Sequence, residues 1–138
     1  MNSEKVIADY LRQHPAVAAI TDRIVSKTPE NTDEPWVRYT QINKVAVGDH
    51  RSDHLIELFI QLDCYAGKDR VSQHDGQPGA TRLAQAVREA MLGIRGTYNG
   101  VVVTGAAVRG DSRIPDIELD HRQRFVQQYV VWMHDGAH

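Results

Sequence analysis

The stretch His54–Tyr65, HLIELFIQLDCY, decides the fold, because apolar residues recur in it at every second position. From Ile56 to Cys64 each alternate residue is apolar, whereas the residues between them mix charged, amide and aromatic side chains. A period of two places successive side chains on opposite faces of a strand. The sequence therefore predicts a strand with one face on a core and the other partly in water, unlike a parallel strand covered on both faces.

The composition is that of an ordinary globular domain. The 138 residues are 41% hydrophobic and 25% charged, and we expect one domain over residues 1–138. A formal net charge of -2 argues against general nucleic-acid binding, which is typical of basic domains. No apolar run approaches the roughly 20 residues of a membrane span, and no signal peptide is evident. We expect a soluble protein without membrane contact.

Two segments show the spacing of amphipathic helices, with apolar residues on one helical face. The first is Ser3–His14, which Pro15 ends because the residue before proline disfavours helical geometry. The second is Ala80–Ile94, which Gly93 and Gly96 bring to an end.

Further strands are predicted on both sides of the long helix. Strict alternation within Trp36–Val47 places Val37 and Val45 on the same face. A turn signal at Tyr98–Val101 precedes a strand that continues to about Val108. The remaining segments are a short strand, a polar connection that contains a proline, and a long final strand: Arg23–Val25, Arg109–Asp120 and His121–His134.

The order of these elements indicates the fold class. Strands occur as hairpin-like neighbours and helices are inserted among them without regular alternation. This order predicts an α+β fold, with a mostly antiparallel sheet of about four to five strands and with an N-terminal helix and one long helix packed on one face.

The aromatic residues do not all fit the helix-covered side of such a sheet. The strand patterns place them on both faces: Trp36, Phe59, Tyr65, Tyr129 and Trp132. Either another subunit covers the second face, or loops and the first helix of the same chain do so. The first alternative is the physical hint that this is an assembly protein.

No arrangement of residues with catalytic chemistry stands out. His50 and His54 have a spacing that suits a metal on a helix, but they lie between two strands, which favours a solvated hairpin. Cys64 lies on the apolar face of its strand and is read as a small buried hydrophobe. The chain contains no phosphate-binding glycine motif. We therefore expect no catalytic residue, no metal and no cofactor.

Acidic residues cluster before the last strand, where they alternate with arginines. A metal site built from these carboxylates is one alternative, but the mixture of charges favours a solvated, self-neutralising loop. The acidic residues are Asp111, Asp116, Glu118 and Asp120.

The order and spacing of several segments resemble a known family. The segments are AVAAI at Ala16–Ile20, EPWVRY at Glu34–Tyr39, ELFIQLDCYA at Glu57–Ala66, LAQAVREAM at Leu83–Met91 and DHRQRF at Asp120–Phe125. Over Val6–Met133 this pattern resembles the small tail completion, or tail terminator, proteins of long-tailed (siphovirus-like) bacteriophages.

The resemblance implies a non-enzymatic virion structural protein, made in the cytoplasm of the host bacterium. It implies a hexameric ring at the head-proximal end of the tail tube, which ends tail polymerisation and provides the head–tail joining surface. The implied partners are further copies of the chain, the tail tube protein and a head–tail connector protein, while DNA passes through the lumen without sequence-specific binding. Another neck or connector ring subunit is the alternative, and a small metal-binding or enzymatic α+β domain is a weaker one.

Two predicted loops supply the candidate contacts with neighbouring subunits or partners. The first is the tip of the hairpin that precedes the predicted strand His54–Tyr65, and the second is the polar connection after Val108. The candidates are Asp49, His50, Arg51, Asp53, Arg109, Asp111 and Arg113.

Overall fold

A computed structural model describes residues 3–27, 35–46, 55–65, 77–116 and 122–135, with side chains for all of these except 77–81, 111–116, 122–124 and 135. The helices are α1 (Ser3–Gln13), α2 (Pro15–Ala18) and α4 (Gln77–Leu92). The strands are β1 (Ile24–Val25), β2 (Trp36–Ala46), β3 (Leu55–Tyr65), β4 (Gly96–Tyr98), β5 (Val101–Asp116) and β6 (Arg122–Asp135).

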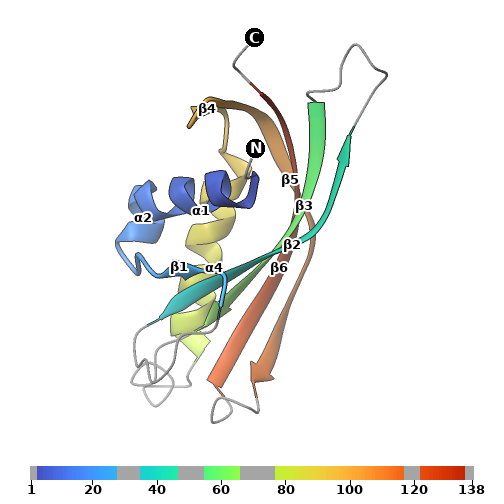
Figure 1. Cartoon of the computed structure of the whole chain (residues 1–138). Coiled ribbons are helices and arrows are strands. Elements are labelled where there is room, and N and C mark those ends of the chain that lie inside the picture. The colour runs from blue at the N-terminus through green and yellow to red at the C-terminus, as the bar shows by residue number, and fades with distance from the viewer. Residues whose placement is uncertain (1–2, 28–34, 47–54, 66–76, 117–121, 136–138) are drawn as a thin grey trace.

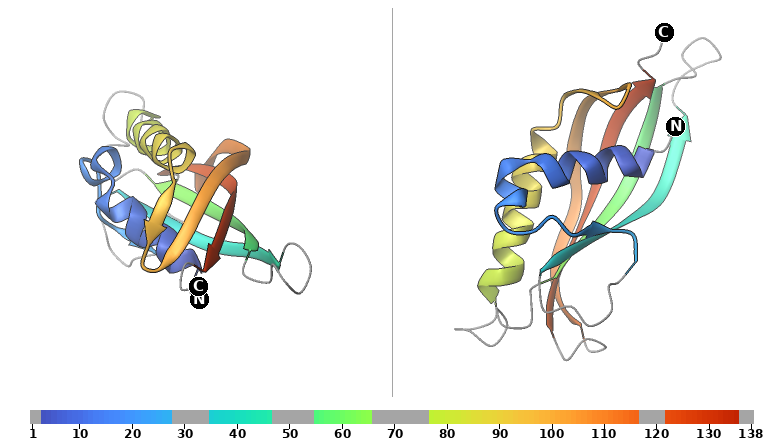
Figure 2. Two further views of the ribbon diagram at one scale, coloured as in Figure 1. Left: turned by 90° about the horizontal axis from the view of Figure 1, so that it is seen from above. Right: turned by 60° about the vertical axis from the view of Figure 1, so that its left-hand side comes forward.

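The strands form one sheet in the order β1-β2-β3-β6-β5-β4. The short strand β1 runs parallel to β2, and every other neighbouring pair is antiparallel. The sheet curls into a half-barrel, and the helices lie on its concave side (Figures 1 and 2). We call this side the helix-covered face and the opposite side the outer face.

The hydrophobic core lies between the helices and the middle of the sheet. In β3 the alternate residues Leu58, Ile60 and Leu62 are fully buried, as the period of two predicts. The helices contribute the apolar residues of their inner faces, which are Val6, Ile7, Leu11, Leu83, Val87, Met91 and Ile94. A direct polar contact joins α1 to α4, because the Tyr10 hydroxyl donates to the Ala90 carbonyl oxygen at 2.6 Å.

The predicted fold class is wrong. The molecule is mostly β, with a six-stranded mixed sheet curled into a half-barrel and only short helices, of which α4 has 16 residues. It is not an antiparallel sheet of four to five strands with one long helix. The expectation failed because β4, of three residues, is too short to show alternation, and because pairing with β6 extends β5 far beyond its apolar segment.

The predicted polar connection at Arg109–Asp120 is wrong over residues 109–116, and residues 117–120 lie outside the described residues. β5 continues to Asp116 and pairs with β6 along its length, so Arg109 lies in a strand and not in a loop. Pro115 is compatible with this strand, because β5 beyond Val103 lies at an edge of the described sheet, where proline is tolerated.

The predicted faces of β2 are wrong beyond its midpoint. The register with β3 shifts between Gln41 and Asn43, so Ile42 is a bulge residue. A bulge adds one residue to one strand and thereby exchanges the two faces beyond it. Val37 therefore pairs with Cys64 on the helix-covered face, whereas Val45 pairs with Glu57 on the outer face and is 38% exposed.

A second bulge lies at the same level of the sheet. Arg109 is the extra residue in β5, between Val108 and Gly110. Both bulges adjoin one row of paired residues across four strands, Gln41–Ile60–Tyr129–Val108. Because bulges bend strands and increase their twist, these two bulges add to the curl of the sheet, as does a further register shift of β5 at Thr104.

The predicted turn between Tyr98 and Val101 is confirmed. Asn99 and Gly100 have φ values of 53° and 80°, and Tyr98 pairs with Val101 across a two-residue loop. Positive φ at both central positions is typical of the type I′ hairpin turn, for which Asn-Gly is the preferred sequence.

Candidate interaction surface

The outer face of the sheet carries the side chains that the core does not use. In β3 these are the alternate residues Glu57, Phe59 and Gln61, which are half-buried. None of the described helices packs on this face (Figure 2). From one end of the strands to the other, the outer face has three parts with different chemistry.

At one end, an aromatic pair and an ion pair are buried. The rings of Trp36 and Tyr65 stack with centroids 4.5 Å apart and an interplanar angle of 13°. Beside them Arg38 donates through Nε and Nη2 to Oδ2 of Asp63, at 3.2 and 2.8 Å. The Asp63 side chain is 0% exposed and that of Arg38 is 28% exposed, so this contact replaces water around a buried carboxylate.

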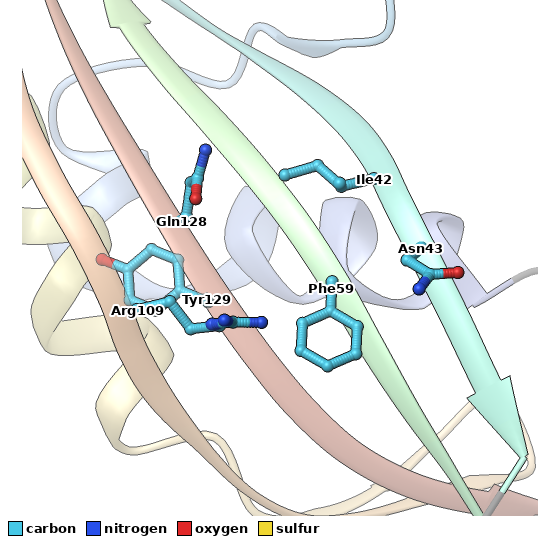
Figure 3. Close-up of a pocket in the computed structure, with 6 residues that line it drawn as sticks. All are labelled: Ile42, Asn43, Phe59, Arg109, Gln128 and Tyr129. Atoms are coloured by element: carbon cyan, nitrogen blue, oxygen red, sulfur yellow. The ribbon is translucent and has the colours of Figure 1, made fainter.

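In the middle of the outer face lies a hollow of about 220 Å³. The guanidinium carbon of Arg109 lies 4.8 Å from the centroid of the Phe59 ring, which is a cation–π geometry (Figure 3). Gln128 donates to the amide oxygen of Gln61 at 3.2 Å. The hollow is lined by Ile42, Asn43, Phe59, Arg109, Gln128 and Tyr129. Its cation and amides can hold a polar segment of a partner, and its lining contains no nucleophile or carboxylate.

At the other end, apolar side chains reach water. Val45 is 38% exposed there, and Ile42, which also lines the hollow in the middle, is 52% exposed. Nearby, the indole Nε1 of Trp132 donates to Oε2 of Glu57 at 2.8 Å, which holds the half-buried indole ring on the sheet. This end combines an aromatic ring with exposed aliphatic side chains, as protein–protein interfaces often do.

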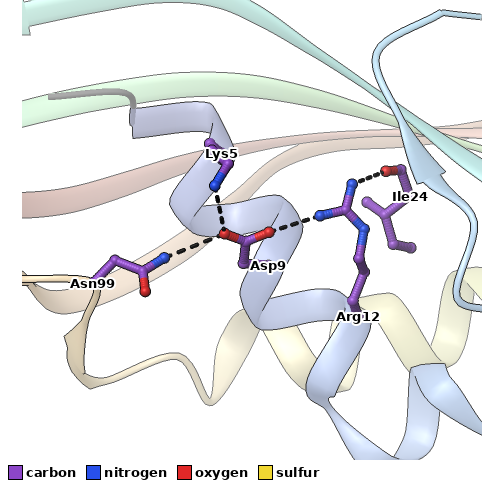
Figure 4. A network of polar contacts seen from close by, with 5 residues as sticks. All are labelled: Lys5, Asp9, Arg12, Ile24 and Asn99. Carbon is purple, nitrogen blue, oxygen red and sulfur yellow. Dashed lines mark hydrogen bonds and ion pairs between the residues drawn. The ribbon is translucent and has the colours of Figure 1, made fainter.

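A polar network on the helix side has a structural role (Figure 4). Asp9 of α1 accepts from Arg12 at 2.7 Å and from Asn99 of the β4–β5 turn at 3.2 Å, and Lys5 lies 3.5 Å away. Arg12 also donates to the Ile24 carbonyl oxygen of β1 at 2.5 Å. The network therefore ties α1 to elements near both edges of the sheet and leaves no acidic group poised for chemistry.

The described residues contain no candidate metal cluster, and the thiol of Cys64 is unreactive. No group of three or more His, Cys, Asp or Glu side chains is close enough to hold a metal among them. Burial, followed by the nearby carboxylate of Asp63, raises the pKa of the Cys64 thiol far above its usual range. The thiol stays protonated at neutral pH and is not a nucleophile.

The structure describes only part of the predicted contact set. Asp49, His50, Arg51 and Asp53 lie in residues 47–54, outside the described residues, as does His54 of the histidine pair. Arg109 is described and lies on the outer face against Phe59. The backbones of Asp111 and Arg113 lie in β5, but their side chains are outside the described set.

The sequence did not predict the contacts between side chains on the outer face. The Arg38–Asp63 pair joins directly opposed residues of β2 and β3, so the strand register was the missing information. The sequence predicted that the aromatic residues lie on both faces of the sheet, and the same register shows which face each of the following three occupies. Tyr129 lies on the helix-covered face opposite Ile60, while Phe59 and Trp132 are on the outer face.

No helix in the described ranges is both long and apolar enough to cross a bilayer. No curated protein matches the chain. Among solved structures, the fold is similar to that of a chain in the virion of a native gene transfer agent (GTA) particle. The TM-score is 0.65 at 14% identity, and the match covers 93% of this chain and 91% of that chain.

The curled sheet, with helices on one side and an open outer face on the other, is thus a fold that also occurs in virion particles. The family model described as tail completion protein gp17 matches residues 5–132. The chain belongs to this family, which confirms the resemblance seen in its sequence. It is a structural protein of a bacteriophage tail, and its place is the virion.

Proposed function

We propose that the chain forms a closed, hexameric ring at the head-proximal end of the tail tube. The ring ends polymerisation of the tube and presents a joining surface to the head connector, with DNA passing through its lumen. In this role the protein works by binding alone: its partners are further copies of itself, the tube protein and the connector protein. Membership of the tail completion family supports the placement.

The observation that carries the proposal is the exposure of apolar groups on the outer face. Ile42 is 52% exposed and Val45 38%, beside the half-buried rings of Phe59 and Trp132. Contiguous apolar surface on a folded subunit favours association, because water is released when a partner covers it. A ring subunit needs such surface, whereas a protein that acts alone does not.

The proposed ring also gives a role to the residues predicted as contacts. In a ring each subunit uses two different patches against its two neighbours. We propose the hairpin-tip residues Asp49, His50, Arg51 and Asp53 and the β5 residues Arg109, Asp111 and Arg113 as contacts with neighbours, tube or connector. Arg51→Glu should leave the monomer folded and weaken assembly.

Native mass spectrometry over a wide concentration range, with negative-stain imaging of the largest species, tests the ring. We expect hexamers with a central hole, from the chain alone or after purified tail tubes are added. Monomers that neither form rings nor cap tubes would contradict the proposal.

The position in the virion needs a second experiment. Phage particles made without the protein should have tails of uncontrolled length. Tails of normal length that fail to join heads would instead assign the chain to a neck or connector ring.

A further inference from the structure

Among the residues that the structure describes, both edges of the sheet are open over most of their length. β1 pairs only with Val37 and Arg38 of β2, and β4 pairs only with residues 101–103 of β5. In the part of the chain that the structure describes, β2 from residue 39 and β5 from residue 104 therefore have no strand on their outer sides. Open edges present rows of N–H and C=O groups that can pair with another strand.

The two open edges lie at the same levels of the sheet. One row of paired residues runs Tyr39–Leu62–Gln127–Asp111, and another runs Val45–Glu57–Trp132–Gly105. Residues 39–45 of β2 thus share their levels with residues 105–111 of β5. The short strands β1 and β4 cover opposite ends of these two edges, so neither obstructs the stretch that the edges share.

The directions of the two edge strands also match. β2 is antiparallel to β3, β3 to β6 and β6 to β5, so β2 and β5 run in opposite directions. A second copy rotated about an axis parallel to the strands presents its β2 to the β5 of the first. The two strands then meet antiparallel, which is the pairing used by most of this sheet.

The side chains along the two edges are complementary in size. On the outer face β2 presents Asn43 and the exposed Val45, together with the bulged Ile42. At the corresponding levels β5 presents the small residues Gly105 and Ala107. A neighbouring β5 edge can approach β2 closely and cover its exposed aliphatic groups.

We propose that the β2 edge of one copy pairs antiparallel with the β5 edge of the next, so that the subunit sheets join into one continuous sheet around the ring. The inference rests on the proposed ring and specifies its contact. The contact is heterologous, because the two edges differ, and repeated rotation closes it. The bulges at Ile42 and Arg109 restrict the edges to matching registers and limit unspecific strand addition.

Paired cysteines on the two edges test this contact. Asn43→Cys is combined in turn with Gly105→Cys, Ala107→Cys or Gly110→Cys, which all face outward at steps along β5 and allow for an axial offset between copies. A Cβ added at either glycine meets nothing within 4 Å, so these substitutions fit. The natural Cys64 is fully buried on the helix-covered face and does not compete.

On oxidation we expect at least one double variant to give a disulfide-linked ladder that ends at the subunit number of the ring. Each single-cysteine variant should stay monomeric on the same non-reducing gel. The matched control combines Asn43→Cys with Ala106→Cys, which packs toward the core, and should give no ladder. Thermal unfolding identifies any variant that is misfolded, and the three partner positions give independent trials.

The contrary outcomes separate the contact from the ring itself. Dimers from a single-cysteine variant would show like edges meeting and would overturn the inference. Rings without any ladder would overturn it too, while leaving the proposed function intact. The absence of rings with and without tail tubes would overturn both.

Discussion

The two faces of β3 divide two tasks between alternate residues of one strand. Leu58, Ile60 and Leu62 are fully buried under the helices, whereas Glu57 and Phe59, on the outer face, are half-buried. The first set provides the apolar burial that stabilises the subunit. The second set makes polar and cation–π contacts that hold the side chains in place but leave them partly exposed. A substitution should therefore affect folding or assembly according to the parity of its position.

The largest expected effect comes from a charge on the helix-covered face. Leu58→Asp places a carboxylate in the core, where an unpaired charge costs several kcal/mol of a total stability of about 5–15 kcal/mol. We expect no folded protein by far-UV circular dichroism. The control is Phe59→Asp, one residue further on and beside Arg109, which should remain folded. Equal loss of folding in both variants would refute the division of faces.

The next largest effect is expected at the buried end of the outer face, where the two faces differ least in burial. Arg38→Met leaves the Asp63 carboxylate buried without its guanidinium, which should lower the free energy of unfolding by about 3 kcal/mol. Urea denaturation measures this loss. The double variant Arg38→Met/Asp63→Leu removes both charges and should recover much of it. Equal instability of the single and double variants would mean that the ion pair is not the cause.

A smaller effect concerns the titration of the Cys64 thiol on the helix-covered face. Because burial raises its pKa in the folded state, the unfolded thiol ionises first as the pH rises above about 9. Its contribution to stability is therefore present below pH 9 and lost above it, by about 1 kcal/mol per pH unit. Urea denaturation at pH 8 and pH 10 should show a smaller decrease for Cys64→Ala. An identical decrease would contradict the burial of this thiol.

The smallest effect is expected on the exposed end of the outer face. Glu57→Gln weakens the hydrogen bond from the Trp132 indole by removing the charge of its acceptor, at a cost of about 1 kcal/mol or less. The fluorescence maximum of the protein should shift because the indole environment changes, while the thermal unfolding temperature changes little. A large loss of stability would show that this face supports folding as the other face does.

Local patterns in the sequence predicted α1, α4 and the apolar parts of β2, β3, β5 and β6. The alternation of Leu58, Ile60 and Leu62 corresponds to the buried face of β3, and the Asn99–Gly100 turn lies where its sequence predicts it. These features depend on near neighbours in the chain, through the period of a strand and the preference of a turn for positive φ. The family resemblance also followed from the order of such segments.

The lengths of the strands and the set of residues on the outer face could be learned only from the tertiary structure. Strand pairing extends β5 through glycines and Pro115, and a bulge at Ile42 moves Val45 to the outer face. Only the register brings Arg38 to Asp63 and Arg109 to Phe59. The sequence by itself thus determined the two longer helices, the apolar parts of the main strands and which face of β3 is buried, because these follow from local periodicity. The tertiary structure alone decided the six-stranded half-barrel and its open edges, because hydrogen bonding between distant strands selects them.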